Sequence, residues 1–145
     1  MKTFARRRVL VVDDNAHART FLAQILGAVD VEVLQADGAA QALRALATQP
    51  VDAVILDMFM APMDGIALTR EIRASDSGQV AALPVVMASA QASREVVRGA
   101  VAAGVSGFIA KPFTPAAVLR QLAVALAAPA RRAVPAPSGR PTPVR

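Results

Sequence analysis

The feature that most constrains the fold of this chain is a series of five short apolar runs that alternate with amphipathic stretches. The runs consist mainly of Val, Ile and Leu, without polar alternation, and occupy residues 9–12, 31–34, 51–56, 84–87 and 107–109. Such runs are typical of strands that are buried on both faces of a parallel sheet. The pattern therefore predicts an α/β protein.

The segments between the apolar runs carry helix signals. Apolar residues recur at helical spacing from Phe21 to Val29. A second helix is expected after Asp37, which we predict to be its N-cap, and Thr114 is the predicted N-cap of the last helix. The remaining two helices are expected after Asp64 and near Ser93. Five βα units with right-handed crossovers place helices on both faces of one sheet.

Composition limits the size of the protein and the kinds of metal site it can hold. The chain has 145 residues and 54% hydrophobic residues, which is enough apolar material for one packed domain. It has no cysteine, and His17 is its only histidine. Disulfides, iron–sulfur clusters and thiolate or imidazole zinc sites are therefore excluded, so any metal must be bound by oxygen.

Basic residues are concentrated at the two ends of the chain. Residues 1–8 and residues 129–145 hold four basic residues each and no acid, whereas the segment between them has eight basic and eleven acidic residues. We interpret the ends as a basic N-terminal arm over residues 1–7 and a Pro/Arg-rich flexible tail over residues 128–145. Contact of these ends with nucleic acid is the alternative, which the scarcity of aromatic residues disfavours.

No segment has the pattern of a signal peptide or a membrane span. The apolar run after the basic N-terminus is interrupted by Asp13 and Asp14, which makes it too short for either role. We therefore expect a cytoplasmic protein without a membrane partner.

Polar residues follow four of the five predicted strands. Asp13 and Asp14 follow the first strand, Asp57 the third, Ser89 the fourth and Lys111 the fifth. Because the carboxyl ends of parallel strands meet at one edge of the sheet, we expect these side chains to share a crevice. Each has an ordinary structural explanation by itself, such as helix capping by one of the paired aspartates. Their occurrence at four matching strand ends favours a functional site.

The charges of this set favour a divalent cation and phosphoryl chemistry. Two carboxylates about 4 Å apart repel by about 4 kcal/mol at an effective dielectric constant near 20. Lys111 offsets one charge, and an all-oxygen site suits Mg²⁺, with Mn²⁺ as a substitute. A carboxylate beside Mg²⁺ and a lysine can attack phosphorus. We predict Asp57 as this nucleophile, since it follows a central apolar strand, with the Ser89 hydroxyl and the Lys111 ammonium on phosphoryl oxygens.

The sequence resembles the receiver domain of two-component response regulators, in particular the single-domain chemotaxis regulators, over residues 8–127. The resemblance is carried by the paired aspartates after the first strand, the Leu56-Asp57 motif, Asp64-Gly65, Ser89-Ala90 and Lys111-Pro112-Phe113. It implies a flavodoxin-like, doubly wound sheet of five parallel strands in the order 2-1-3-4-5 with five helices. It also implies a cis peptide bond at Lys111-Pro112.

The resemblance further assigns roles to individual residues. Asp57 is implied as the phosphorylated residue and Mg²⁺ as the cofactor. The implied Mg²⁺ ligands are Asp14 directly, Asp13 through water, Asp57 itself and the Phe59 carbonyl. Ser89 and Phe108 are implied as the switch pair. Two positions depart from the family pattern, since Ala61 occupies the place of a frequent proline and Phe108 that of a frequent tyrosine.

The predicted function is a phosphoacceptor switch rather than an enzyme. Its expected partners are a sensor histidine kinase or a histidine phosphotransfer protein and a downstream protein target, and phosphorylation-linked homodimerisation through the last helix is compatible with the sequence. Two alternatives stay open. One is an unphosphorylated scaffold whose basic ends bind nucleic acid or protein. The other is a Mg²⁺-dependent aspartyl phosphatase, which the lack of a second acid at position 59 disfavours.

Overall fold

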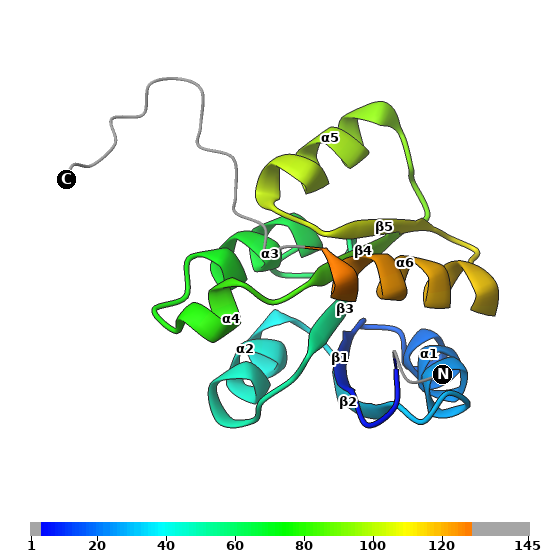
Figure 1. Cartoon of the computed structure of the whole chain (residues 1–145). Helices are drawn as coiled ribbons and strands as arrows, with labels where there is room; N and C mark the ends of the chain where they lie inside the picture. The colour runs from blue at the N-terminus through cyan, green and yellow to red at the C-terminus, as the bar shows by residue number, and fades with distance from the viewer. Residues whose placement is uncertain (1–3, 129–145) are drawn as a thin grey trace, which may run out of the picture.

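The structure, a computed structural model, describes residues 4–128 of the chain (Figure 1). Within this range, five strands alternate with helices along the sequence. The strands are β1 (Arg8–Val12), β2 (Glu32–Ala36), β3 (Ala53–Asp57), β4 (Val85–Ser89) and β5 (Gly107–Ala110). The helices are α1 (Ala16–Gly27), α2 (Ala39–Thr48), α3 (Gly65–Arg73), α4 (Gly78–Ala81), α5 (Arg94–Ala103) and α6 (Pro115–Ala127).

The strands form one parallel sheet in the order β2-β1-β3-β4-β5, which confirms the predicted topology. In the register, Val12 of β1 lies opposite Leu56 of β3, and Asp57 lies opposite Ala88 of β4. The carboxyl ends of these three adjacent strands therefore lie at the same level. The residues that follow them are consequently brought to one edge of the sheet.

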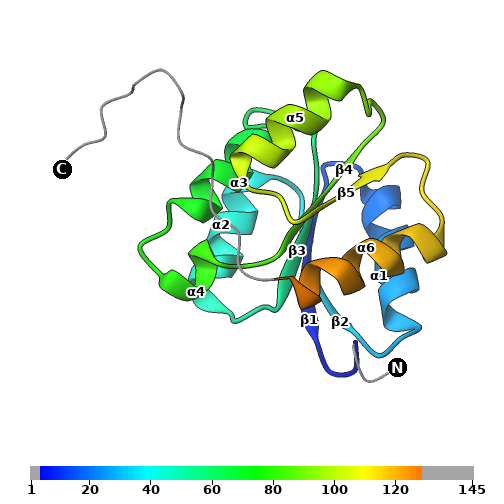
Figure 2. The ribbon, with the colours of Figure 1, turned by 45° about the horizontal axis from the view of Figure 1, so that its top comes forward.

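Each face of the sheet is covered by its own hydrophobic core (Figure 2). Along β1, Leu10 and Val12 pack on the side of α2, α3 and α5, whereas Val9 and Val11 pack on the side of α1 and α6. This alternation follows from the two-residue period of a strand. It explains why the central strands β3 and β4 are almost entirely apolar, since both of their faces are buried.

The predicted number of five helices is wrong, because residues 4–128 form six, with α4 as the additional one. It is a single turn of four residues, with the Ser77 hydroxyl accepting a hydrogen bond from the Val80 amide. One turn is too short to show helical periodicity in a sequence.

The predicted N-cap at Asp37 is also wrong. Gly38 occupies the N-cap position of α2 without a side-chain hydrogen bond, and the Asp37 amide donates to the Gln41 side chain at 2.6 Å. The predicted start of α6 is confirmed, since the Thr114 hydroxyl accepts a hydrogen bond from the Ala117 amide and Pro115 opens the helix. The peptide bond between Lys111 and Pro112 is cis, as predicted.

The N-terminal segment contacts the sheet where it is described. Phe4 is buried among the apolar residues on the α1 side of the sheet, and the Arg6 amide donates to the Asp30 carbonyl at 3.0 Å. Residues 1–3 of the predicted basic arm and residues 129–145 of the predicted tail lie outside the described residues. Within residues 4–128, no helix is long and apolar enough to cross a membrane.

Candidate functional site

The loop after β1 holds the first two acids of the site. Asp13 is buried and Asp14 is exposed. The Asp13 carboxylate accepts a hydrogen bond from the Asn15 amide at 2.9 Å, and the Arg19 guanidinium donates to the Asp13 carbonyl at 2.7 Å. Neither aspartate caps α1, because the N-cap is Asn15. The carboxylates are therefore not used as helix caps and remain available to the site.

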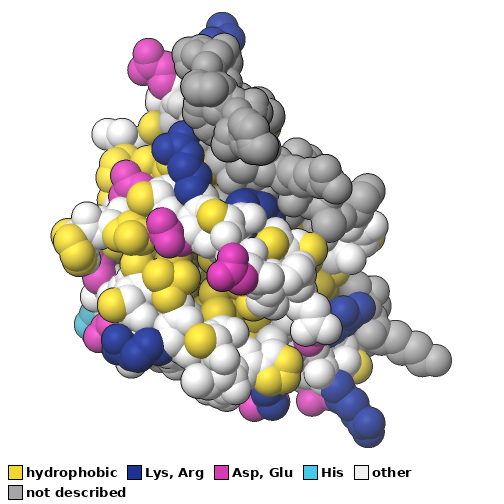
Figure 3. All heavy atoms as spheres, turned by 90° about the vertical axis from the view of Figure 1, so that its left-hand side faces the viewer, with side chains coloured by type: hydrophobic (Ala, Val, Ile, Leu, Met, Phe, Trp, Pro, Cys, Tyr) yellow, Lys and Arg dark blue, Asp and Glu magenta, His cyan; other side chains and the backbone are white. Residues whose placement is uncertain are grey.

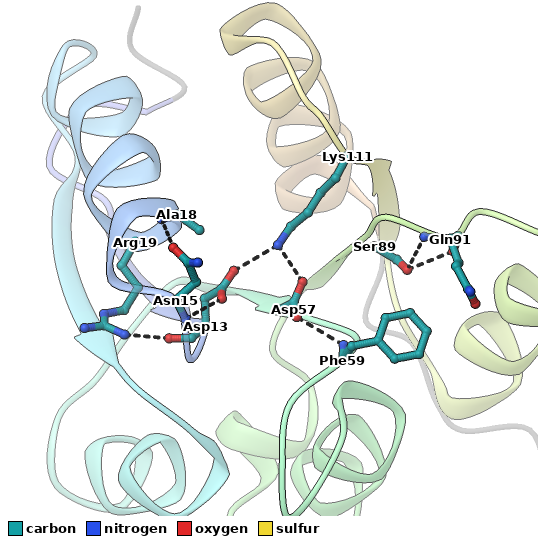
Figure 4. A network of polar contacts seen from close by, with 9 residues as sticks. All are labelled: Asp13, Asn15, Ala18, Arg19, Asp57, Phe59, Ser89, Gln91 and Lys111. Carbon is teal, nitrogen blue, oxygen red and sulfur yellow. Dashed lines mark hydrogen bonds and ion pairs between the residues drawn. The ribbon is translucent and has the colours of Figure 1, made fainter.

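Lys111 joins two carboxylates that come from different strands (Figure 4). Asp57 is the last residue of β3 and is buried, and Lys111 follows β5. The Lys111 ammonium lies 2.7 Å from one Asp57 oxygen and 3.1 Å from one Asp13 oxygen. The ammonium is thus held between the ends of β1 and β3 by two ion pairs.

Asp14 completes a cluster of three carboxylates. One oxygen from each of Asp13, Asp14 and Asp57 lies within 4.8 Å of the other two. Three negative charges at this separation exceed the single charge of Lys111, and hard oxygen ligands at such spacing suit a divalent cation. The structure therefore brings together all four charged residues that the sequence predicted for the site.

Burial is the largest influence on the ionisation of Asp57. It raises the pKa of the Asp57 carboxyl above its ordinary value, and the nearby Asp13 charge acts in the same direction, although Lys111 and the Phe59 amide oppose them. Burial by itself would lower the pKa of the Lys111 ammonium. The hydrogen bonds and charges of Asp57 and Asp13 outweigh that effect, so the pKa of Lys111 is raised. The lysine is therefore charged at neutral pH.

A close approach of Gly65 fixes the loop after β3. The Gly65 amide donates to the Met58 carbonyl at 2.7 Å, and a Cβ atom at Gly65 would lie 2.5 Å from the Asp57 carbonyl oxygen. No side chain fits at this distance, so position 65 requires glycine.

The Phe59 amide donates to the second Asp57 oxygen at 3.1 Å, and the Phe59 side chain is 47% exposed.

Ser89 lies at the end of β4, but its hydroxyl contacts Gln91 rather than the acidic cluster. The Ser89 hydroxyl donates to the Gln91 carbonyl at 2.8 Å and accepts from the Gln91 amide at 3.0 Å (Figure 4). Phe108, in the neighbouring strand β5, is half-buried and packs against the core on the α5 side of the sheet.

Asn15 and Arg19 hold the loop of Asp13 and were not among the residues predicted for the site. The signal for Asn15 was available, because asparagine is a preferred N-cap residue directly before a helix. Arg19 carried no such signal. It acts through one backbone carbonyl and through the Gln35 side chain at 3.1 Å, and both contacts depend on the tertiary structure.

Comparison with known proteins agrees with this geometry. The family profile of the response regulator receiver domain matches residues 9–123. The chain therefore belongs to the response regulator receiver domain family. Receiver domains are the phosphoacceptor modules of two-component signalling and bind Mg²⁺ at an acidic cluster, and they are signalling domains rather than conventional enzymes. Neither the scaffold nor the phosphatase alternative is favoured.

Two curated relatives match this chain over most of its length. The chain is 36% identical to the sensory/regulatory protein RpfC of Xanthomonas campestris over 80% of its own length, but it spans only 16% of that protein. It is 37% identical to the chemotaxis protein CheY-3 of Vibrio cholerae, covering 79% of this chain and 88% of the relative.

A solved structure gives the same fold. The receiver domain of the sensor histidine kinase PA1611 from Pseudomonas aeruginosa superimposes with a TM-score of 0.77 at 28% identity, covering 86% of this chain and all of that domain. That structure has a magnesium ion coordinated in its active site cleft.

Proposed function

We propose that Asp57 is the residue that accepts the phosphoryl group. The observation that carries this proposal is the position of the Lys111 ammonium, 2.7 Å from an Asp57 oxygen at the edge of a three-carboxylate cluster. An Asp57 oxygen would attack phosphorus as the bond between phosphorus and the donor breaks. Lys111 would then bind one phosphoryl oxygen. The positive charge of its ammonium, which already lies beside Asp57, would stabilise the transferred group.

We further propose that the acidic cluster binds Mg²⁺. Its three carboxylates are all oxygen donors, and together they exceed the charge of Lys111, so they fit a hard dication. Asp14 would be a direct ligand, Asp13 a ligand through water, and Asp57 and the Phe59 carbonyl the remaining protein ligands. When bound, the ion would neutralise charge on the phosphoryl oxygens.

Ser89 and Phe108 are proposed as the residues that convert phosphorylation into a change of surface. The Ser89 hydroxyl would leave the Gln91 backbone to bind a phosphoryl oxygen on Asp57. Phe108 is half-buried, so its ring can move into the space that is vacated. The surface of α5, β5 and α6 would change as a population shift between two packings.

The proposed donor is the phosphohistidine of a sensor histidine kinase or of a histidine phosphotransfer protein. The relatives support this class of partner, because RpfC is a sensory/regulatory protein and the PA1611 domain belongs to a sensor histidine kinase. The signal would pass to a downstream protein target in the cytoplasm. Pairing of two phosphorylated copies through α6 is a further part of the proposal.

Mass spectrometry after incubation with Mg²⁺ and a small acyl-phosphate donor tests the proposal. We expect a stoichiometric, base-labile phosphoryl adduct on Asp57. Rapid turnover of the donor without accumulation of the adduct would instead support the phosphatase alternative. Absence of any adduct would support the scaffold alternative.

Mg²⁺ is expected to stabilise the wild-type protein more than the Asp14→Ala variant. At about ten times its dissociation constant, a ligand that binds only the folded state adds about 1.4 kcal/mol to stability, or roughly 3–6 °C in Tm. The rise in Tm on adding Mg²⁺ should be measured for wild type, Asp14→Ala and Asp37→Ala. Asp37 is exposed and outside the cluster, so its variant should keep the full rise. Equal rises in all three proteins would contradict the assignment of Asp14.

The exposed Phe59 side chain is expected to slow hydrolysis of the phosphorylated residue. It stands two residues after Asp57, where it can restrict the approach of water to the phosphoryl group. Phe59→Asn replaces the ring with a polar amide and should therefore shorten the half-life of the adduct. The decay of purified phosphoprotein gives this half-life directly. An unchanged half-life would show that the ring does not shield the site.

A further inference from the structure

A groove lies at the opposite edge of the sheet from Asp57. It has a volume of about 1030 Å³ and is bounded by α2, α3, α4 and the segments that lead into β3 and β4. Buried Leu46, Ile72 and Leu83 contribute to its lining, together with half-buried Val51 and Val80. The helix α4 that borders the groove is only one turn long, and Val51 and Val80 are the partly exposed residues among these five.

The size and charge of the groove define what it can bind. Its volume reaches the upper end of the range for small-molecule pockets, about 300–1,000 Å³, so it has room for several residues of an extended peptide. Among the described residues, its lining includes the acids Asp52 and Glu71 but no lysine or arginine. Figure 3 shows this face, on which hydrophobic side chains gather with acidic side chains among them and basic side chains around them.

Two acids near the groove are available to a basic ligand. Asp52 already accepts a hydrogen bond from the Arg8 amide and pairs with Arg7. Glu71 lines the groove, and Asp76 lies between two serines that line it. Both are exposed and have no ion pair within residues 4–128.

The C-terminal segment of the same chain has the complementary composition. Residues 129–145 include five prolines, four arginines and several alanines and valines, and no acid. Proline-rich segments favour the extended polyproline conformation, which loses little entropy when it docks in an apolar groove. The arginines would supply the charge opposite to that of Glu71 and Asp76.

Helix α6, which precedes this segment, ends toward the edge of the sheet where the groove lies. Helix α6 follows the carboxyl end of β5 and runs back across the sheet, so Ala128 lies toward the edge where β3 and β4 begin. In Figures 1 and 2 the end of α6 points toward α4. Seventeen residues at about 3.1 Å each reach roughly 50 Å, well beyond the radius of gyration of about 14 Å for a domain of this size.

We propose that residues 129–145 bind in the groove between α2, α3 and α4 of their own domain. The prolines and alanines contact the apolar lining, and the arginines pair with Glu71 and Asp76. The groove and the phosphorylation site occupy opposite edges of the sheet. Binding of the segment therefore does not depend on the state of Asp57, and the inference stands independently of the proposed function.

Paramagnetic relaxation in the full chain tests this proposal. The chain has no cysteine, so Ser138→Cys provides a unique site for a nitroxide label within the segment. We expect the amide signals of Val51, Val80 and Leu83 to be much weaker with the paramagnetic nitroxide than in the spectrum recorded after the nitroxide is reduced. The signals of Asp13, Ser89 and Lys111, at the edge of the sheet that holds the acidic cluster, should keep their intensity. Equal effects on both regions, or no effect on the groove, would overturn the proposal.

A charge variant and a mixing experiment complete the test. The double variant Glu71→Lys, Asp76→Lys should restore much of the lost intensity, whereas the matched control Glu95→Lys, an exposed acid on α5, should not. If the loss of signal intensity in the double variant equals that in the parent protein, the proposed pairing of the arginines with Glu71 and Asp76 is overturned. Mixing isotope-labelled protein without nitroxide with unlabelled spin-labelled protein should give no loss. A loss in that mixture would assign the groove to the segment of a second copy and overturn binding within one chain.

Discussion

Asp57→Asn is expected to abolish the base-labile phosphoryl adduct that forms with an acyl-phosphate donor. The amide that replaces the carboxylate lacks an anionic oxygen that can attack phosphorus, whereas it preserves the size of the side chain. Asp37→Asn serves as the control, because Asp37 is exposed and lies outside the acidic cluster. Intact-mass measurement of both variants reports the adduct. An adduct that persists in Asp57→Asn on Asp13 or Asp14 would contradict the assignment of the nucleophile.

The same substitution is expected to raise stability in metal-free buffer. Burial raises the pKa of Asp57 above its ordinary value, so the folded state disfavours the charged carboxylate. The stability linked to this group is therefore present at low pH and is lost as the pH rises through the raised pKa. At neutral pH, Asp57→Asn should therefore have a higher Tm than the wild type.

The pH dependence of Tm tests whether Asp57→Asn is more stable than the wild type for this reason. The difference in Tm between Asp57→Asn and wild type should shrink as the pH falls toward the raised pKa, where wild-type Asp57 takes up a proton. A difference that grows on acidification would mean that the Lys111 ion pair outweighs burial. Thermal melts in chelator at several pH values distinguish these two outcomes.

Gly65→Ala is expected to be strongly destabilising. The added Cβ atom would lie 2.5 Å from the Asp57 carbonyl oxygen, 2.9 Å from the Met58 Cα and 3.0 Å from a Leu56 methyl carbon. Two of these atoms belong to the backbone beside the site and cannot rotate away. Overpacking of this kind costs about 2–3 kcal/mol, which corresponds to roughly 4–12 °C in Tm for a domain of this size.

Gly27→Ala is the matched control for this prediction. Gly27 is the last residue of α1, and a Cβ atom there would have no neighbour within 4 Å. Alanine also favours the helix, so this variant should be neutral or more stable by about 0.4–1 kcal/mol. Calorimetry of both variants measures the contrast. Similar Tm values for the two would show that the loop after β3 moves to accept a side chain.

The sheet was predictable because its strands are buried on both faces. Central strand β3 is apolar from Ala53 to Leu56, and the limits of the predicted apolar run differ from those of the strand by at most two residues. The edge strand β2 was harder to delimit, since it includes exposed Glu32 and Gln35, which an edge position tolerates. The apolar stripe from Phe21 to Val29 marked α1 but overstated its buried face. Leu22, Ile25 and Leu26 are buried, whereas the Phe21 side chain is 41% exposed.

The charged residues of the site were predictable for a topological reason. Residues at the carboxyl ends of neighbouring parallel strands must meet, so Asp57 and Lys111 could be paired although they are far apart in the sequence. The contacts of Arg19 and the groove beside α4 could not be inferred in this way. They depend on how loops and a single helical turn pack, for which the sequence has no periodic signal.

The contacts of the Ser89 hydroxyl determine which substitutions at position 91 the unphosphorylated protein tolerates. Both of its partners belong to the main chain of residue 91, so the identity of the side chain there does not affect them. Nineteen residue types can donate this N–H group, and only proline lacks it. Drift at position 91 can therefore alter how the loop meets other molecules without releasing the hydroxyl from its initial orientation.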